Sequence, residues 1–416
     1  MPITLPSVVR IPMTQGGQAG CRPVVRSGDR VCVGQLIGDS KSAMAAPVHS
    51  SVSGTVISIE RGPSQQEQND IHVVIETDGR QTVADTVQPP VINSRADFLQ
   101  AVRSCGLVGL GGAGFPTERK YAASKKTPLH TLIVNGAECE PFVTSDHTNM
   151  TVYVRDIIAG SAAIMKWLAI EKCIIAIGAD KKETAELYRS VTAELSGISV
   201  ALLPRQFPAG EETMVIREAA HVRILPGNLP ADQGFLVSNS TTVLKLQHYL
   251  MTGMPLVSRT VTVDGDAVKM PMNVEVPVGT SIADVLAFCA GEKKPLRKLI
   301  AGGPMTGTAL PSAELSVIKT NNALLFFSEN RSDLNKETAC INCGRCMENC
   351  PAGLVPTMLY KQWLQKDLKS LEKNHILACI GCGCCSYGCP ARKPLSDALT
   401  MAKETVAAGK PMENDR

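Results

Sequence analysis

Apolar residues up to position 85 form short runs that are separated by turn-forming segments. Turns are indicated by S-G-D at 27–29 and R-G-P-S at 61–64, and the pair Pro89 and Pro90 marks a boundary. Short apolar runs between such segments are typical of β-strands. The pattern therefore predicts a small β-sandwich or barrel, with strands in the runs at 24–25, 31–37, 52–59 and 71–75.

The pattern changes between residues 95 and 250, where strand-like and helix-like segments alternate. Strands are predicted at 132–135, 173–177 and 198–203, and helices at 153–168 and 181–195. Alternation of this kind requires crossover connections and predicts a mostly parallel sheet. We therefore expect an α/β unit in the middle of the chain.

Residues 255 to 305 return to short strands, at 261–263 and 274–276, followed by one helix at 281–289. This order indicates a small α+β unit. From Thr338 onward, cysteine motifs lie among helical segments, the clearest of which is 359–376. A chain of 416 residues is long for a single core, so a multidomain protein is expected.

Composition narrows the possible partners. Apolar residues make up 44% of the chain, and the net charge of +3 is spread without a block of Lys or Arg, so no nucleic-acid partner is expected. No apolar run approaches the roughly 18 residues that span a bilayer, and the N-terminus lacks the features of an export signal. We expect a cytoplasmic chain without a direct membrane span. Among its 15 cysteines, the clustered ones are expected to bind metal rather than form disulfides.

The cysteines provide the clearest chemical signal. The motif C-x-x-C-x-x-C-x-x-x-C-P occurs twice, and in two-cluster ferredoxins the fourth cysteine of each copy binds the other cluster. A zinc site is the alternative, although zinc ribbons rarely place three ligands so closely and then repeat the run. Cys384 is out of register and is expected to be a spare, buried thiol. The predicted ligands of two [4Fe-4S] clusters are Cys340, Cys343, Cys346 and Cys389 for the first, and Cys379, Cys382, Cys385 and Cys350 for the second.

A glycine-rich segment at 106–117, G-L-V-G-L-G-G-A-G-F-P-T, contains the string Gly109-x-Gly111-x-x-Gly114. A dinucleotide-binding fingerprint needs a strand before it, whereas residues 96–105 show helical spacing, so a standard Rossmann site is not expected. Dense glycine still lets backbone N–H groups approach a phosphate or a flat ring. A flexible connection is the alternative.

Two acidic segments accompany the glycine loop. N-G-A-E-C-E-P at 135–141 follows a predicted strand, at the edge of a sheet that usually presents ligand groups. P-A-G-E-E-T at 208–213 opens a helix, where Glu211 and Glu212 are equally explained as first-turn charges that the helix dipole stabilises. Spacing alone leaves both interpretations open.

The order of these motifs resembles one family over nearly the whole chain. The β-rich start, G-L-G-G-A-G-F-P-T, N-G-A-E-C-E-P, L-P-A-D-Q-G and the doubled cysteine motif together resemble the C subunit of the Rnf ion-translocating ferredoxin:NAD oxidoreductase. The central part is also similar to the flavin- and NADH-binding subunit of respiratory complex I. The fold that this resemblance implies has a barrel-sandwich domain at 1–88, a Rossmann-like α/β FMN/NADH domain at 92–252, a β-grasp (SLBB) domain at 255–310 and a helical two-[4Fe-4S] ferredoxin domain at 330–405.

The resemblance also implies the cofactors and their ligands. NAD(H) would exchange electrons with FMN, and two [4Fe-4S] clusters would relay them singly; no residue would have a covalent catalytic role. The residues carried over to the FMN and NADH site are Gly109, Gly111, Gly112, Gly114, Phe115, Lys120, Asn135, Glu138, Glu140, Gly210, Glu211, Glu212, Thr213, Asn239 and Thr242.

The implied partners are the other subunits of an Rnf-type membrane complex, with ferredoxin or flavodoxin also possible, and the implied location is the cytoplasmic face of the inner membrane. P-A-G-E-E-T is nearer to the complex I motif than to the Rnf form. One alternative is therefore a soluble NADH-dependent flavo-iron-sulfur reductase that feeds another enzyme, such as proline reductase or cobalamin reductase. A second alternative is a ferredoxin-like relay with a degenerate nucleotide site.

Overall fold

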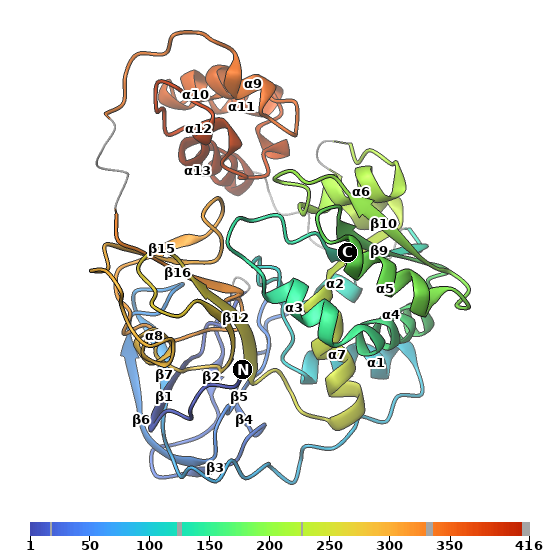
Figure 1. Cartoon of the computed structure of the whole chain (residues 1–416), viewed down its shortest axis with the longest axis vertical. Helices are drawn as coiled ribbons and strands as arrows, with labels where there is room; N and C mark the ends of the chain where they lie inside the picture. The colour runs from blue at the N-terminus through green and yellow to red at the C-terminus, as the bar shows by residue number, and fades with distance from the viewer. Residues whose placement is uncertain (17–18, 123–126, 226–227, 330–335, 410–416) are drawn as a thin grey trace.

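The computed structural model describes residues 1–16, 19–122, 127–225, 228–329 and 336–409. Figure 1 shows the C-terminal helices as a unit at the top, a yellow-to-orange β-rich unit below them, the blue N-terminal β-rich unit at the bottom, and the α/β unit to the right of both. Residue 330, the expected start of the last domain, lies outside the described residues. Within the described ranges, no helix has the length and apolarity needed to cross a bilayer.

Two small sheets form the N-terminal unit, as predicted. One sheet has the order β1-β7-β6-β3 and the other the order β2-β4-β5. Side chains such as Ile11, Val56 and Ile75 are fully buried in this unit. The apolar run at 31–37 is divided between both sheets, because a turn closed by the Gln35 amide and the Cys32 carbonyl (3.1 Å) interrupts it. The strands are β1 (Val8–Pro12), β2 (Arg22–Pro23), β3 (Arg30–Val31), β4 (Leu36–Asp39), β5 (Val48–His49), β6 (Gly54–Gly62) and β7 (Asp70–Thr77).

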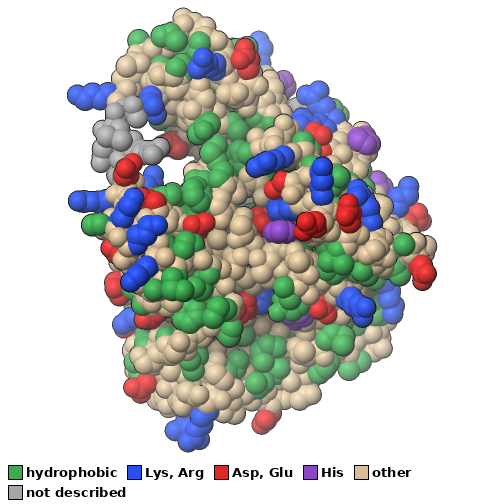
Figure 2. Space-filling view, in the orientation of Figure 1, with side chains coloured by type: hydrophobic (Ala, Val, Ile, Leu, Met, Phe, Trp, Pro, Cys, Tyr) green, Lys and Arg blue, Asp and Glu red, His purple; other side chains and the backbone are tan. Residues whose placement is uncertain are grey.

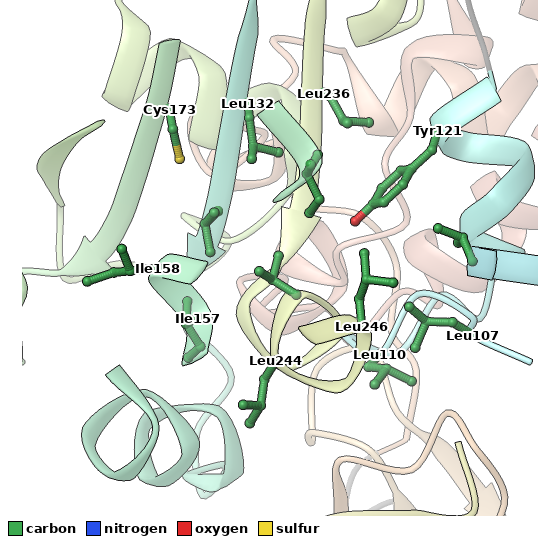
Figure 3. Close-up of a cluster of buried hydrophobic side chains, with 14 of the residues drawn as sticks. Leu107, Leu110, Tyr121, Leu132, Ile157, Ile158, Cys173, Leu236, Leu244 and Leu246 are labelled. Carbon is green, nitrogen blue, oxygen red and sulfur yellow. The ribbon is translucent and has the colours of Figure 1, made fainter. Parts of the chain in front are cut away.

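A four-stranded parallel sheet with the order β10-β9-β8-β11 forms the central unit, which confirms the α/β prediction. Figure 3 shows Leu132 and Cys173 from the sheet in one apolar cluster with Ile157 from α4. The strands are β8 (Thr131–Gly136), β9 (Lys172–Gly178), β10 (Ile198–Leu203) and β11 (Phe235–Asn239). The helices are α1 (Arg95–Ser104), α2 (Thr117–Ala122), α3 (Ser145–Val152), α4 (Val154–Leu168), α5 (Lys182–Thr192), α6 (Glu212–Ala220) and α7 (Ser240–Thr252).

The β-grasp unit is a five-stranded sheet with the order β13-β12-β16-β14-β15, covered by α8 (Ile282–Phe288). The predicted strands and helix are present. The strand β16 lies in the middle of the sheet although it comes last in the chain. The strands are β12 (Ser258–Asp264), β13 (Met272–Pro277), β14 (Lys298–Ala301), β15 (Thr308–Leu310) and β16 (Ala323–Phe327).

Short helices build the C-terminal unit around buried leucines such as Leu359, Leu371 and Leu399. The helical segment expected at 359–376 is present, but it is divided into two helices. The chain leaves the helical conformation at Lys366, whose φ is +56°, and Asp367 starts the next helix by accepting the Ser370 amide at 3.1 Å. The helices are α9 (Arg345–Glu348), α10 (Pro356–Leu364), α11 (Leu368–Lys373), α12 (Cys384–Tyr387) and α13 (Leu395–Ala408).

Candidate functional site

The glycine loop is a closed turn rather than a flexible connection. It follows α1, as its sequence context predicts, and leads into α2. The Gly109 amide donates to the Phe115 carbonyl at 2.8 Å, and the Gly114 amide donates to the Gly109 carbonyl at 3.1 Å. Gly112 and Gly114 have φ values of +108° and +67°, a region that side chains disfavour. The glycines therefore fix one backbone path between the two helices.

Two buried cations from the β-grasp unit hold this loop from behind. Arg259 donates from Nη2 to the Leu110 carbonyl at 3.1 Å, and Lys319 donates from Nζ to the Gly106 carbonyl at 2.8 Å. Both side chains are 1% exposed. Burial lowers the pKa of Lys319 to about 8 and that of Arg259 to about 10. Sequence reasoning missed both residues, because neither belongs to a motif.

The carboxyl ends of β8 and β11 bring two predicted residues together. Asn135 and Asn239 are paired in the register of the two parallel strands. Asn135 donates from Nδ2 to the Gly210 carbonyl at 2.8 Å, so it joins the first acidic segment to the second. Asn239 accepts the Thr242 amide at 3.1 Å and thereby caps α7, while Thr242 Oγ1 accepts the Leu110 amide at 3.0 Å. Thr242 therefore supports the glycine loop.

Glu138 is a buried carboxylate at the start of α3. It accepts the amides of Asp146 and His147 at 2.7 and 3.2 Å, and Lys181 Nζ lies 3.5 Å from its Oε2. Burial, with a smaller contribution from the Asp146 charge, raises the pKa of Glu138 to about 8 against the opposing effect of Lys181. A carboxyl group in this state can hold or release a proton near neutral pH. Asp146, which belongs to no motif, also accepts a hydrogen bond from Asn239 Nδ2 at 2.6 Å.

Glu140 binds a turn of the β-grasp unit. One carboxylate oxygen accepts the Met305 amide at 3.0 Å, and the other accepts the Thr306 amide at 2.9 Å and the Thr306 hydroxyl at 2.5 Å. Both oxygens are therefore already engaged by the protein itself.

The two neighbouring glutamates of P-A-G-E-E-T have different surroundings. Glu211 caps α6, since its Oε2 accepts the amides of Thr213 at 2.9 Å and Met214 at 3.2 Å. Glu212 forms an ion pair with Lys120 of α2. Glu211 is thus well explained as a residue that stabilises the start of α6. Glu212 instead contacts α2, the helix that follows the glycine loop.

One cavity of about 420 Å³ collects these elements, a size typical of small-molecule sites. Its walls come from the glycine loop, both acidic segments, the turn at Thr306 and the cysteine loop at Ile380 and Cys382. Gly112, Gly114, Thr213 and Thr242 do not line it. The predicted residues that line it are Gly109, Gly111, Phe115, Lys120, Asn135, Glu138, Glu140, Gly210, Glu211, Glu212 and Asn239.

The cavity suits a flat, polar ligand. A Cβ at Gly111 would lie 3.4 Å from Asn239 Nδ2. The absence of a side chain at Gly111 therefore leaves the space beside Asn239 open. Asparagine and lysine side chains provide donors, and Glu138 and Glu212 provide acceptors. A pteridine-like ring with an anionic tail would match this set of groups.

The two cysteine motifs have the same backbone conformation. Asn342 and Gly381 have φ values of +54° and +64°, and Gly344 and Gly383 have +79° and +78°. Each copy continues into a one-turn helix, α9 or α12. The doubled sequence motif is therefore a doubled loop structure.

The second copy and the end of the first meet at a cavity of about 20 Å³. Cys350 lines it together with Cys379, Cys382 and Cys385, which is the predicted cross-motif set, and Cys384 lies there too. Backbone amides point at sulfurs of this set; the Leu354 amide, for example, donates to Cys350 Sγ at 3.3 Å. Among the described residues, no three His, Cys, Asp or Glu side chains are arranged as a metal site; the two loops bring the four cysteines to one cavity.

The first copy is nearer to the surface. Cys346 is buried and Cys343 is exposed. The Thr338 amide donates to the Ala391 carbonyl at 3.0 Å, which places the segment before Cys340 beside the segment after Cys389. Over the face in Figure 2, basic and acidic side chains are interspersed, without a large patch of one sign.

Comparison with known proteins gives the same order of units. Four family models match: RnfC barrel sandwich hybrid domain at 1–80, Nuo51 FMN-binding domain at 102–248, SLBB domain at 260–309 and 4Fe-4S dicluster domain at 339–393.

Two similar curated proteins are components of ion-translocating complexes. The chain is 34% identical to the C subunit of the Na(+)-translocating ferredoxin:NAD(+) oxidoreductase complex of Acetobacterium woodii, over 97% of this chain and 92% of the relative. It is 35% identical to the C subunit of the proton-translocating ferredoxin:NAD(+) oxidoreductase complex of Clostridium ljungdahlii, over 85% of this chain and 78% of the relative.

Among solved structures, a chain of the NAD+-reducing [NiFe]-hydrogenase in the air-oxidized state is similar. The TM-score is 0.52 at 20% identity, and the match covers 67% of this chain and 54% of that chain. This likeness supports the fold.

Proposed function

Because this chain belongs to the RnfC family, we propose that it exchanges electrons between NAD(H) and FMN in the 420 Å³ cavity and relays them through two [4Fe-4S] clusters. The observation that carries this proposal is the composition of that cavity. The glycine loop, both acidic segments and the cysteine loop at Cys382 all contribute to its wall.

The chain's residues divide between two binding tasks. Gly109, Gly111 and the two asparagines, Asn135 and Asn239, would hold FMN against the sheet edge. When bound, FMN accepts electrons in pairs and releases them singly. Glu138, with its pKa raised to about 8 by burial, would hold or release a proton at its carboxyl oxygen.

NAD(H) would bind at the open side of the cavity. Phe115 is 38% exposed there and offers a ring for stacking. Lys120 and Glu212, which form an ion pair, lie on the same wall and would recognise the phosphate and ribose groups. The glycine loop would exclude side chains from the space where the two rings meet.

The position of the cysteines gives an order to the relay. The site that we propose for Cys350, Cys379, Cys382 and Cys385 would be the inner one, since Cys382 lines both the 20 Å³ cavity and the 420 Å³ cavity. The site of Cys340, Cys343, Cys346 and Cys389 is the outer one, since Cys343 is exposed. Electrons from NADH would therefore pass from the inner site to the outer one and leave at the surface.

Neither alternative from the sequence is favoured. A degenerate nucleotide site is disfavoured because the Nuo51 FMN-binding domain matches across 102–248 and its motif residues meet in one cavity. A soluble reductase for proline reductase or cobalamin has no counterpart in the names of the two relatives described above, which belong to oxidoreductase complexes.

We propose that the partners are other subunits of such a complex, with ferredoxin as its redox substrate. The chain would be peripheral on the cytoplasmic face of the membrane. The domain bounds 1–88, 92–252, 255–310 and 330–405 are part of the same proposal.

Anaerobic purification followed by NADH titration tests the function. We expect one FMN and about eight irons per chain, flavin bleaching by NADH in the visible absorption band, and then cluster reduction seen by electron paramagnetic resonance. Iron at this level without FMN or NADH bleaching would contradict the proposal and support a simple relay.

A further inference from the structure

The turn between β14 and β15 lies between the flavin-site loop and the cysteine loop. It runs from Gly302 to Gly307, and β15 lies at the edge of the β-grasp sheet that faces the C-terminal helices in Figure 1. Its sequence, G-G-P-M-T-G, belongs to none of the motifs assigned above. Its two sides contact two different parts of the predicted electron route.

On one side the turn receives the Glu140 carboxylate. The amides of Met305 and Thr306 and the Thr306 hydroxyl donate to it at 3.0, 2.9 and 2.5 Å. Hydrogen bonds to a charged acceptor are stronger than those between neutral groups. A Cβ at Gly303 would lie 2.4 Å from the Glu140 carboxyl group, so this glycine is needed for the approach.

On the other side the turn contacts the cysteine loop. A Cβ at Gly383 would lie 3.1 Å from the Met305 carbonyl oxygen. Gly383 stands between Cys382 and Cys384 and has a φ of +78°. Met305 thus places its amide on Glu140 and its carbonyl against the loop that carries Cys382.

The turn itself is firmly shaped. The Gly307 amide donates to the Gly303 carbonyl at 2.8 Å, and the Gly302 amide donates to the Ala323 carbonyl of β16 at 2.8 Å. The loop that bears Glu140 also packs on this sheet, since Val143 is buried with Ile300 and Leu325, and Phe142 contacts Phe327 edge to face. Displacement of Glu140 would therefore move the turn locally rather than unfold the sheet.

We propose that this turn is a spacer that sets the position of the Cys382 loop relative to the flavin cavity, with Glu140 as the positioning residue. The inference depends on the proposed function, because the cavity and the inner cluster define the two ends of the spacing. Cys382 and Thr306 both line the cavity, so a shift of the turn changes that wall directly. The β-grasp unit thereby acquires a role in electron transfer through the position of this turn.

Hydrogen exchange of backbone amides tests whether the turn holds the Cys382 loop in place, and it needs no electron transfer. In Glu140→Gln the carboxamide NH2 replaces one of the two oxygens, so one of the two backbone amides loses its acceptor. In Gly303→Ala the new methyl group displaces the carboxylate. We expect both variants to exchange faster at Met305 and Thr306 and also at 382–387. Glu314→Gln, which changes an exposed carboxylate of the same unit, is the matched control. Faster exchange confined to 305–306 would overturn the spacer.

Rapid kinetics on the purified, cofactor-loaded chain test the electron-transfer part. In Glu140→Gln and Gly303→Ala, compared with wild type, we expect cluster reduction to slow by about tenfold more than flavin reduction by NADH. A small misplacement of reacting groups has a large effect on rate. If both steps slow by the same factor, or neither slows, Glu140 does not set the spacing. A wild-type chain that binds no FMN would refute the proposed function, while the exchange experiment would still report on the turn.

Discussion

Arg259 Nη2 donates a 3.1 Å hydrogen bond to the carbonyl of Leu110 in the glycine loop, and the two residues are 149 positions apart in the chain. The Leu110 amide is bound as well, by Thr242 Oγ1 at 3.0 Å. Leu110 is thus held at both of its backbone polar groups by elements outside the loop. A buried guanidinium keeps the loop in the shape that the cavity requires.

Replacing Arg259 by methionine should weaken FMN binding by about tenfold or more, since a hydrogen bond from a charged group contributes about 1.5–3 kcal/mol. Fluorescence titration of the flavin-free protein with FMN measures the effect. Arg297→Met, at an exposed position of the same unit, is the control. Equal dissociation constants for both variants would show that the loop keeps its shape without Arg259.

Lys319 predicts a pH dependence of stability. Its pKa is lowered to about 8 by burial, whereas the unfolded chain has the ordinary value of 10.5. Between these values the unfolded state binds one more proton, so the free energy of unfolding contributed by Lys319 rises with pH, by up to about 1.4 kcal/mol per unit. The facing thiols Cys21 and Cys105 both have a raised pKa from burial, that of Cys105 to about 12.

Urea unfolding at two pH values, one just below the pKa of about 8 and one between it and 10.5, measures this dependence. Wild type should gain stability relative to Lys319→Met as pH rises through the window, and Lys293→Met, at an exposed position, controls for the loss of a lysine elsewhere. A constant difference between wild type and Lys319→Met would mean that Lys319 keeps its proton throughout.

The two adjacent glutamates should separate stability from binding. Glu211→Ala removes the α6 cap and should lower the free energy of unfolding by about 1 kcal/mol. Glu212→Gln breaks a partly exposed pair with Lys120 and should leave stability nearly unchanged while raising the KM for NADH several-fold. Unfolding curves and steady-state kinetics of both variants check this contrast, and the reverse assignment of effects would contradict it.

Cysteine variants test the cross-motif ligation. Cys350→Ser should remove about four irons and the reduction of the inner cluster, while NADH still bleaches the flavin. Cys384→Ser is the matched control, since it changes a thiol beside the same small cavity and should keep all the iron. Iron analysis and electron paramagnetic resonance distinguish them. Iron loss from Cys384→Ser together with full iron in Cys350→Ser would make Cys384 the ligand in place of Cys350.

The pattern of apolar residues within a segment correctly predicts a helix or strand where that segment alone determines its secondary structure. The helix at Val154–Leu168 and the strands at Thr131–Gly136 and Ile198–Leu203 follow from periodicity. The helical segment expected at 359–376 is divided at Lys366, which adopts the left-handed conformation although no asparagine or glycine marks the break.

Contacts between distant segments were not predictable from one sequence. Arg259 lies in an ordinary strand, and Lys319 lies in a connection 213 residues from the Gly106 carbonyl that it binds. Glu140 was assigned to the flavin by resemblance, and only the structure shows its carboxylate on the Met305 and Thr306 amides. Folding brings these residues together, and the spacing of residues within a motif does not predict such contacts.

Cys343 is exposed, whereas Cys382 is only partly exposed, and this difference has a consequence for damage by air. Oxidants reach an accessible sulfur first, so the outer cluster should decay before the inner one. A partly inactivated chain would then still consume NADH but would have lost its outlet, and its electrons would be open to capture by oxygen at the flavin. Anaerobic handling would therefore first of all preserve electron transfer from the flavin to the outer cluster.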